Sequence, residues 1–346
     1  MKIAIIGAGF FGTICGIRLS NKHEVHIYEK NKGILKGASL ANQLRFHLGY
    51  HYPRSPKTVK EIKKHYKDFI KFFGQNIFGK TKNLYGISKE KSKVSFKKYL
   101  LFLKKNNLKY KKIKTKKFSN KIEGQILSYE KNLNYFKARN IIKRQLKKNK
   151  VKIFYNTKFN KKLIKDYDKI IVATYDQNNT VLNSLGLKIK NNYKYELVEK
   201  IIIKLPKKYK NISCMVIDGK FVCLDPYIGT KYHLLSDVKN SKLEVLENKY
   251  PKFKNRNKKY LNSGIVKNIK ISKFKNFIKH GSLYLPFVKN SKYIGSFFVT
   301  RVIKIHKEKT DERLNEITKV NKKIISIFSG KWNTCIGIAK NLENII

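Results

Sequence analysis

The chain has 346 residues, of which 41% are hydrophobic and 12% aromatic. This is enough apolar material for about two globular domains, and it excludes a disordered chain. The four cysteines lie far apart and form no CxxC pair, so the sequence indicates neither a disulfide framework nor a zinc ribbon. We therefore expect no metal site.

Positive charge dominates the composition. Lys and Arg total 79 against 22 Asp and Glu, a formal net charge of +57, and only eight of the 79 are Arg. Base readout and bidentate phosphate contacts favour Arg, so we interpret most lysines as a solvated surface and expect no specific nucleic-acid partner. Contact with an anionic membrane surface is compatible with this charge, and small anionic ligands would be attracted. The composition does not fix an oligomeric state.

No apolar run approaches the roughly 20 residues that a membrane-spanning helix needs. The apolar start of the chain carries three glycines at fixed spacing and no small-residue cleavage site, unlike a secretory leader. These features favour a cytoplasmic location.

The first predicted elements are a buried parallel strand over 2–6, a glycine turn and a helix over 11–20. Gly7, Gly9 and Gly12 form a GxGxxG pattern between strand and helix. In such a turn the first glycine permits the bend, the second lets a pyrophosphate approach the backbone, and the third allows close helix–strand packing. The N-terminus of the helix then offers N–H groups to the phosphates.

A second strand is predicted over 24–28, and Glu29 follows it directly. A carboxylate at this position accepts the ribose hydroxyls of a dinucleotide and disfavours a 2′-phosphate. The pattern therefore predicts FAD or NAD rather than NADP. A tight turn without a ligand is the alternative interpretation.

The chain does not continue in the regular βαβ units of a nicotinamide enzyme. Residues 31–58 are rich in glycine, polar and aromatic residues, which suits a loop around a large ligand. Further along, the pattern predicts helices over 56–74 and 138–149, strands over 151–155, 167–175 and 324–328, and a strand-rich stretch over 195–238.

Four segments together resemble a known family: GAGFFG with Glu29, ANQLRFHLGYHYPRS, VATY and SGKWNT. They are similar to the FAD-dependent oxidoreductases of the D-amino-acid oxidase and glycerol-3-phosphate dehydrogenase superfamily. The resemblance implies an α/β fold in which a Rossmann-type FAD-binding domain accompanies a discontinuous α+β substrate domain built on an antiparallel sheet. The FAD-binding domain would comprise residues 1–60, 130–185 and 290–346, and the substrate domain residues 61–129 and 186–289.

The resemblance also implies a set of cofactor contacts. The residues are Gly7, Gly9, Phe11, Gly12, Glu29, Ser39, Asn42, Arg45, Thr174, Gly330, Lys331, Trp332 and Thr334. Ser39 and Asn42 would lie along the diphosphate and the flavin. The turn around Lys331 would face the pyrimidine end of the flavin, where helix N–H groups stabilise the reduced ring. As a structural element alone, this turn would carry a solvated lysine and a helix cap at Thr334.

The catalytic candidates are His47, His51 and Arg301. In an extended chain Arg45, His47 and His51 fall on one face, which would place a cation and an imidazole near the flavin. Histidine is suited to accept a proton near neutral pH, although both histidines could equally be buried structural residues. Arg301 is the first candidate for binding an acidic substrate.

Together these features predict an FAD-dependent oxidoreductase. It would oxidise a CH–NH or CH–OH bond of a small, anionic substrate by hydride transfer to flavin N5. One alternative is a flavin-dependent mutase or isomerase acting on a nucleotide sugar. Another is a non-enzymatic protein that holds the dinucleotide structurally and binds a polyanion with its basic surface.

Overall fold

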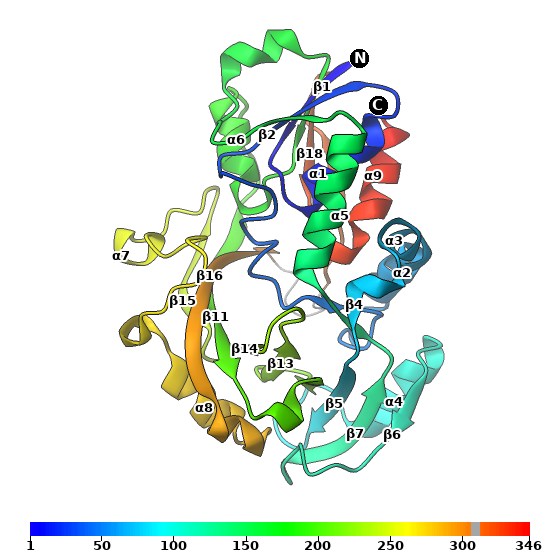
Figure 1. Cartoon of the computed structure of the whole chain (residues 1–346), viewed down its shortest axis with the longest axis vertical. Helices are drawn as coiled ribbons and strands as arrows, with labels where there is room; N and C mark the ends of the chain where they lie inside the picture. Colours follow the sequence, from blue (N-terminus) through cyan, green and yellow to red (C-terminus); the bar gives the residue numbers. More distant parts are fainter. Residues whose placement is uncertain (306–311) are drawn as a thin grey trace.

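The computed structural model describes residues 1–305 and 312–346, and two large sheets dominate the part it describes (Figure 1). Residues 306–311, within the predicted FAD-binding stretch 290–346, lie outside the described residues. In the first sheet only β17 runs antiparallel to its neighbour. Its strands, in spatial order, are β17 Glu316–Lys319, β18 Ile324–Phe328, β10 Lys169–Val172, β1 Lys2–Ile6, β2 Glu24–Tyr28 and β9 Lys152–Phe154.

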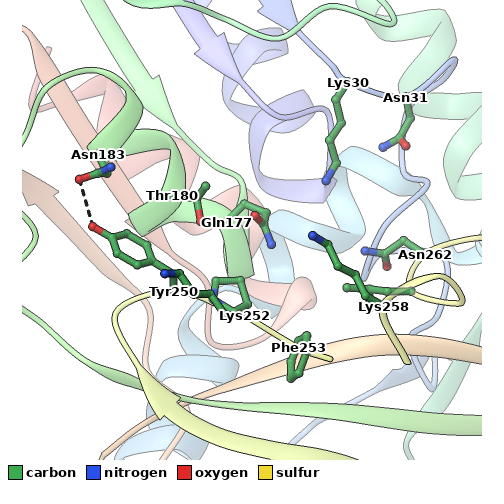
Figure 2. A pocket seen from close by; sticks show the side chains of 12 residues that line it. Lys30, Asn31, Gln177, Thr180, Asn183, Tyr250, Lys252, Phe253, Lys258 and Asn262 are labelled. Atoms are coloured by element: carbon green, nitrogen blue, oxygen red, sulfur yellow. Dashed lines mark hydrogen bonds between the residues drawn. The ribbon is translucent and has the colours of Figure 1, made fainter. Parts of the chain in front are cut away.

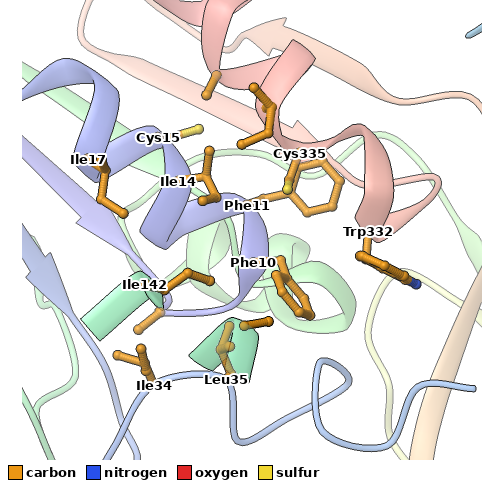
Figure 3. Close-up of a cluster of buried hydrophobic side chains, with 14 of the residues drawn as sticks. Phe10, Phe11, Ile14, Cys15, Ile17, Ile34, Leu35, Ile142, Trp332 and Cys335 are labelled. Carbon is orange, nitrogen blue, oxygen red and sulfur yellow. The ribbon is translucent and has the colours of Figure 1, made fainter. Parts of the chain in front are cut away.

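Helices cover both faces of this sheet. Ile3 and Ile5 of β1 pack into one hydrophobic cluster, and Ala4 and Ile6 pack into another, because successive side chains of a strand point to opposite faces. The first cluster contains α1 Phe10–Leu19, α5 Tyr135–Lys148 and α9 Cys335–Glu343, and the second contains α6 Asn178–Ser184. Figure 3 shows α1 and α9 meeting in the first cluster. The predicted central strand, buried on both faces, is confirmed.

The second sheet, in the lower half of Figure 1, contains nine strands in the described residues. Most of its neighbours are antiparallel, and β12 with β5 is a parallel pair. The strands are β15 Lys242–Asn248, β11 Tyr193–Lys204, β14 His233–Asp237, β13 Val222–Pro226, β12 Ile212–Ile217, β5 Lys82–Ser88, β7 Ile122–Ser128 and β6 Tyr110–Lys112, with β16 Lys292–Lys304 along β11. The predicted fold class, with its antiparallel substrate sheet, is confirmed.

The remaining elements are short. They are the small sheet of β3 Arg45–Phe46, β8 Lys131–Leu133 and β4 Phe78–Gly79, and the helices α2 Pro56–Lys64, α3 Tyr66–Phe73, α4 Phe96–Lys105, α7 Asn255–Lys258 and α8 Phe274–Gly281. The single helix predicted over 56–74 is thus two helices, because the backbone of His65 leaves the helical conformation between them. Within residues 1–305 and 312–346, no helix has the length and apolar character needed to cross a membrane.

The predicted division into domains stays a prediction. Strand β16 and helix α3 each contact elements that the division assigns to the other domain. Strand β16 lies in the predicted FAD-binding stretch, yet it pairs with β11 of the second sheet along its whole length. Helix α3 lies in the predicted substrate stretch, yet Phe69 and Phe73 pack into the first cluster with Trp332. Apolar faces, rather than order in the chain, decide where these two segments pack.

We predict that Gly337→Ala destabilises the protein. A Cβ at position 337 would lie 2.0 Å from Nδ1 of His65, whose residue is only 4% exposed. Overpacking of this kind costs about 1–3 kcal/mol of unfolding free energy, measured by urea denaturation. Asn341→Ala, exposed on the same helix, should change it by less than about 0.5 kcal/mol. Equal stability of Gly337→Ala and the wild type would contradict this packing.

Candidate functional site

The glycine turn after β1 contains two positions that tolerate no side chain and one that does. Gly7 has φ +101°, and a Cβ there would lie 2.8 Å from the carbonyl oxygen of Ala173. A Cβ on Gly12 would lie 1.9 Å from the Gly7 oxygen. At Gly9 the nearest atom to a Cβ would be Oγ of Ser39, at 3.4 Å. Gly7 and Gly12 are therefore required by the fold, whereas Gly9 leaves space beside the helix.

The N-terminus of α1 is suited to an anion. Its N-cap residue is Gly9, which has no side chain that could cap the helix, and the first turn contains no acidic residue. The Phe10 N–H donates to Oγ of Ser39 over 3.3 Å, which places Ser39 at the helix end. The ring of Phe11 packs into the first hydrophobic cluster, so the contact predicted for this residue would be made by its backbone. The backbone amides and the helix dipole are what this end presents to phosphate.

Glu29 is bound to the glycine turn. Its Oε2 accepts the Ala8 N–H over 2.8 Å, and its Oε1 accepts the backbone and side-chain N–H groups of Asn31 over 2.9 and 2.6 Å. An ionised carboxylate has about four lone-pair positions, so these three bonds leave capacity for a ribose hydroxyl.

A cavity of about 680 Å³ opens at the residues that follow Glu29 (Figure 2). Its walls come from the ends of β2 and β10, from α6 and from residues 250–262. Lys30, Lys252 and Lys258 line it, and its lining in the described part of the chain contains no acidic side chain. In Figure 2 Lys30 and Lys258 point toward each other. Such a cavity favours a polar or anionic ligand.

Next to the glycine turn, hydrogen bonds join the ends of β10 and β18. The N–H and the hydroxyl of Thr174 both donate to Oδ1 of Asn178, over 2.8 and 2.9 Å. The Asn178 amide in turn donates to the Ile327 carbonyl over 2.8 Å. Thr174 therefore lies at the strand edge that carries Gly7, and its contact with the cofactor stays a prediction.

The turn after β18 is shaped by Asn315. The Gly330 N–H donates to Oδ1 of Asn315 over 2.8 Å, and the Asn315 amide donates to Oγ1 of Thr334 over 2.8 Å. The ammonium of Lys331 lies 4.9 Å from the centre of the Tyr52 ring. A positively charged turn at the N-terminal end of α9 thus faces the loop that contains Tyr52.

The ring of Trp332 packs into the protein core, and its predicted cofactor contact stays a prediction. Its ring lies 5.5 Å from the Phe10 ring and 5.7 Å from the Phe46 ring, centre to centre, inside the first cluster (Figure 3). The neighbouring Asn333 amide donates to the carbonyl of His47 over 2.9 Å. Trp332 is therefore a core residue, and its neighbour connects the turn to the histidine segment.

The guanidinium of Arg45 is bound to groups of the protein itself. Its residue is 1% exposed, and its Nη2 donates to Oδ1 of Asp225 over 2.8 Å and to Oγ of Ser213 over 2.5 Å. Its Nη1 lies 3.5 Å from Glu130. Burial opposes ionisation of Asp225, yet the guanidinium holds the pKa of that carboxyl below its ordinary value. Arg45 is paired with protein carboxylates, and Asn42 before it accepts the Leu44 N–H over 3.1 Å.

Glu130 lies between Arg45 and His47. Its Oε1 accepts the Leu48 N–H over 2.8 Å, and its Oε2 accepts the hydroxyl of Tyr85 over 2.5 Å. Nδ1 of His47 is 3.7 Å from Oε1. Despite burial, His47 and Arg45 hold the pKa of Glu130 at about 2. Burial lowers the pKa of His47, so its imidazole is neutral near pH 7 and able to accept a proton.

His51 joins this group by a turn rather than along an extended chain. β3 ends at Phe46, and the backbone bends at Gly49, where φ is +120°. The His51 ring then lies 5.6 Å from the His47 ring and 5.2 Å from the Tyr52 ring. The expected extended geometry is wrong, although the two histidines do come together. Among the described residues, no group of three or more His, Cys, Asp or Glu side chains could hold a metal ion.

Arg301 is paired with a protein carboxylate. Its Nε donates to Oε2 of Glu196 over 2.6 Å, and its Nη2 contacts the same oxygen. Glu196 is 1% exposed, and Nζ of Lys242 lies 2.6 Å from its other oxygen. Arg301 is thus already paired within the protein, and its role as an anchor for an acidic substrate stays a prediction.

Three ionisable residues that sequence reasoning missed lie in or beside the second sheet: Glu130, Asp225 and Lys200. Asp225 and Lys200 each interrupt an apolar strand, in VCLDP and in ELVEKIII. A charged residue at an inward position of a strand is rare unless it is paired or functional, and that signal could have identified them.

A family profile described as FAD dependent oxidoreductase matches residues 2–220. No curated protein sequence matches the chain. Among solved structures, L-α-glycerophosphate oxidase from Mycoplasma pneumoniae with FAD bound has a TM-score of 0.73 and 15% identity, covering 99% of this chain and 94% of that one. Glycine oxidase from Geobacillus kaustophilus has a TM-score of 0.72 and 12% identity, with 99% and 94% covered. L-proline dehydrogenase from P. horikoshii has a TM-score of 0.66 and 14% identity, with 98% and 91% covered. At these identities the likeness is one of fold.

We predict that Arg45→Met lowers the free energy of unfolding by about 3–5 kcal/mol, because Asp225 and Glu130 would stay buried without their cation. Arg144→Met, on the exposed side of α5, should change it by less than about 0.5 kcal/mol. Urea denaturation measures both. An Arg45→Met protein as stable as the wild type would show that the buried network contributes nothing.

Proposed function

The chain belongs to the family of FAD dependent oxidoreductases, and on that basis we propose that it oxidises a CH–NH or CH–OH bond of a small, anionic substrate. The observation that carries the proposal is the common edge of three neighbouring parallel strands. Gly7 follows β1, Thr174 is just beyond β10, and Gly330 is just beyond β18. Ligands of open α/β sheets bind at this carboxyl edge.

The residues at this edge fit FAD. Gly9 leaves space at the N-terminus of α1, whose amides would hold the diphosphate with Ser39. Glu29 keeps an acceptor position for the ribose, and the cavity that begins at Lys30 would receive the adenosine end.

When bound, FAD supplies an isoalloxazine ring that accepts a hydride at N5. The protein would hold the ring and stabilise the negative charge that develops on it. The turn from Gly330 to Thr334 would stabilise negative charge on the pyrimidine end, through its amides and the Lys331 ammonium.

His47 is the proposed proton acceptor. Its imidazole is neutral near pH 7, and its Nδ1 faces Glu130 at 3.7 Å, which leaves Nε2 to take the proton from the substrate. Glu130 stays ionised beside it and would stabilise the imidazolium that forms.

A small anionic substrate agrees with the fold neighbours. Their names specify glycine, L-proline and glycerophosphate, each of which carries a carboxylate or a phosphate. The positive charge of the chain would raise the local concentration of such anions.

The proposed function is tested by an absorption spectrum of the purified protein after a high-salt wash, followed by anaerobic addition of pooled amino acids, amines, hydroxy acids and glycerol phosphates. Bound flavin that one pool bleaches supports the proposal. Bound flavin that no pool bleaches contradicts it. In that case nucleotide sugars added to the dithionite-reduced protein test for a mutase.

We predict that Gly9→Val abolishes FAD retention without unfolding the protein. The Cβ would lie at an ordinary distance of 3.4 Å from Oγ of Ser39, but the side chain would occupy the space that the diphosphate needs. Flavin content and urea denaturation are both measured. Gly12→Ala is the contrast, since its Cβ would collide with the turn itself and lower stability as well. Stoichiometric FAD in Gly9→Val would contradict the assignment.

We predict that His47→Gln slows substrate-dependent flavin reduction by about 10²–10⁴-fold and leaves FAD bound. Because the pKa of His47 lies below its ordinary 6.5, the wild-type rate should fall as the pH drops through the range below 6.5, and the variant should lose this limb. Stopped-flow measurement across pH checks both. His51→Gln is the matched comparison and should keep the limb. A pH limb unchanged in His47→Gln would exclude His47 as the base.

A further inference from the structure

One face of the β11–β16 pair is directed toward the proposed cofactor-binding side of the molecule. In the antiparallel register Val198 lies opposite Val299, and Lys200 lies opposite Phe297. Val198, Val299 and Phe297 belong to the same hydrophobic cluster as residues of the glycine turn, of the 38–47 segment and of the turn after β18. Because alternate residues of a strand share a face, Lys200 points to the same side as Val198.

Most charged side chains on this face already have a partner within the protein. Arg301, also on this face, is paired with Glu196. Asp225 accepts from Arg45, from Ser213 and from Asn132 on one oxygen, and from the Cys223 thiol on the other. These carboxylates therefore have little capacity left for another cation.

Lys200 is the exception. In the part of the chain that the structure describes, its ammonium has no hydrogen bond and no carboxylate oxygen within 4.0 Å, although the residue is mostly buried. The charged and titratable groups that act on it are Cys223 and Asp225 from β13 and Arg301 from β16. Burial lowers its pKa to about 8, so it remains mainly charged at pH 7. A desolvated cation without a counterion is costly, unless a ligand supplies the counterion.

We propose that Lys200 anchors the anionic group of the substrate, a carboxylate or a phosphate, on the sheet face that looks toward the cofactor. This rests on the proposed function. The reasoning is one of charge: Arg301 is occupied by Glu196, and Lys200 is the cation on this face that lacks such a partner among the described residues. A lysine is a compact charge without the planar fork of arginine, so it accepts either anion.

The test uses the FAD-loaded protein, with acetate and inorganic phosphate as separate probes. Binding is followed through the visible absorption band of the flavin in the wild type, Lys200→Met, Lys200→Arg and Lys204→Met. Lys204 is the matched control, because it lies on the same strand and is exposed. We expect Lys200→Met to weaken binding by about 10- to 100-fold, the loss of one charged hydrogen bond. Lys200→Arg should retain most of the affinity, and Lys204→Met should stay within about twofold of the wild type.

A second measurement needs neither flavin nor a folded Met variant. In wild-type protein with ¹³C-labelled lysine, the Lys200 Cε resonance, assigned by its absence from Lys200→Arg, should titrate near pH 8 and shift to higher pH with the bound anion. Anion affinity in the wild type should correspondingly fall as the pH rises through about 8, because the charged form of Lys200 is lost.

The two proposals fail in different ways. Absence of bound FAD before any probe is added contradicts the proposed function. If FAD is bound, but acetate and phosphate bind equally to the wild type and to Lys200→Met, or bind to neither, the assignment of Lys200 is overturned while the oxidoreductase stands. A selective response to acetate or to phosphate supports the anchor and identifies which anion it takes.

Discussion

The fully buried guanidinium of Arg45 holds the segment around β3, which carries Arg45, against the second sheet. Its partners Asp225 and Glu130 come from distant parts of the chain, and both carboxylates are as buried as the cation they face. A buried charge that loses its partner costs several kcal/mol, so this segment cannot leave the sheet cheaply. Glu130 of this network also accepts the Leu48 N–H and faces His47, so the network positions His47.

The high net charge is compatible with this fold because nearly all of the lysines stay in solvent. The cations of the second sheet and its surroundings differ in whether a carboxylate is paired with them. Carboxylates neutralise the buried Arg45 and the partly exposed Arg301, whereas the mostly buried Lys200, on the cofactor side of the second sheet, has no carboxylate partner in the described residues. The proposed function of Lys200 is therefore inferred from where individual charges lie and not from the net charge of the chain.

Local signals predicted the nucleotide-binding half well. The strand over 324–328 is observed with these bounds, and the glycine turn, α1 and Glu29 follow the predicted order. These features depend on neighbours in sequence: backbone angles at glycine, alternation along a strand and a helix that begins at a turn. The break at His65 was missed because apolar spacing continued across it. The pairing of β16 was not visible in the sequence either, because its partner strand lies a hundred residues away.

The sequence by itself determined the glycine turn and the carboxylate after the second strand, because both are encoded by residues within about thirty positions. The class of fold followed from a resemblance carried by four segments spread along the chain. Only the tertiary structure decided what the long polar side chains do. Arg45 meets Asp225 across 180 positions, Arg301 meets Glu196 across 105, and Trp332 packs against Phe10 from the opposite end of the chain. A side chain's charge and shape are written in the sequence, but its partner is set by which strands pair and which faces pack, and that partner decides whether an arginine is an anchor for substrate or a support for the fold.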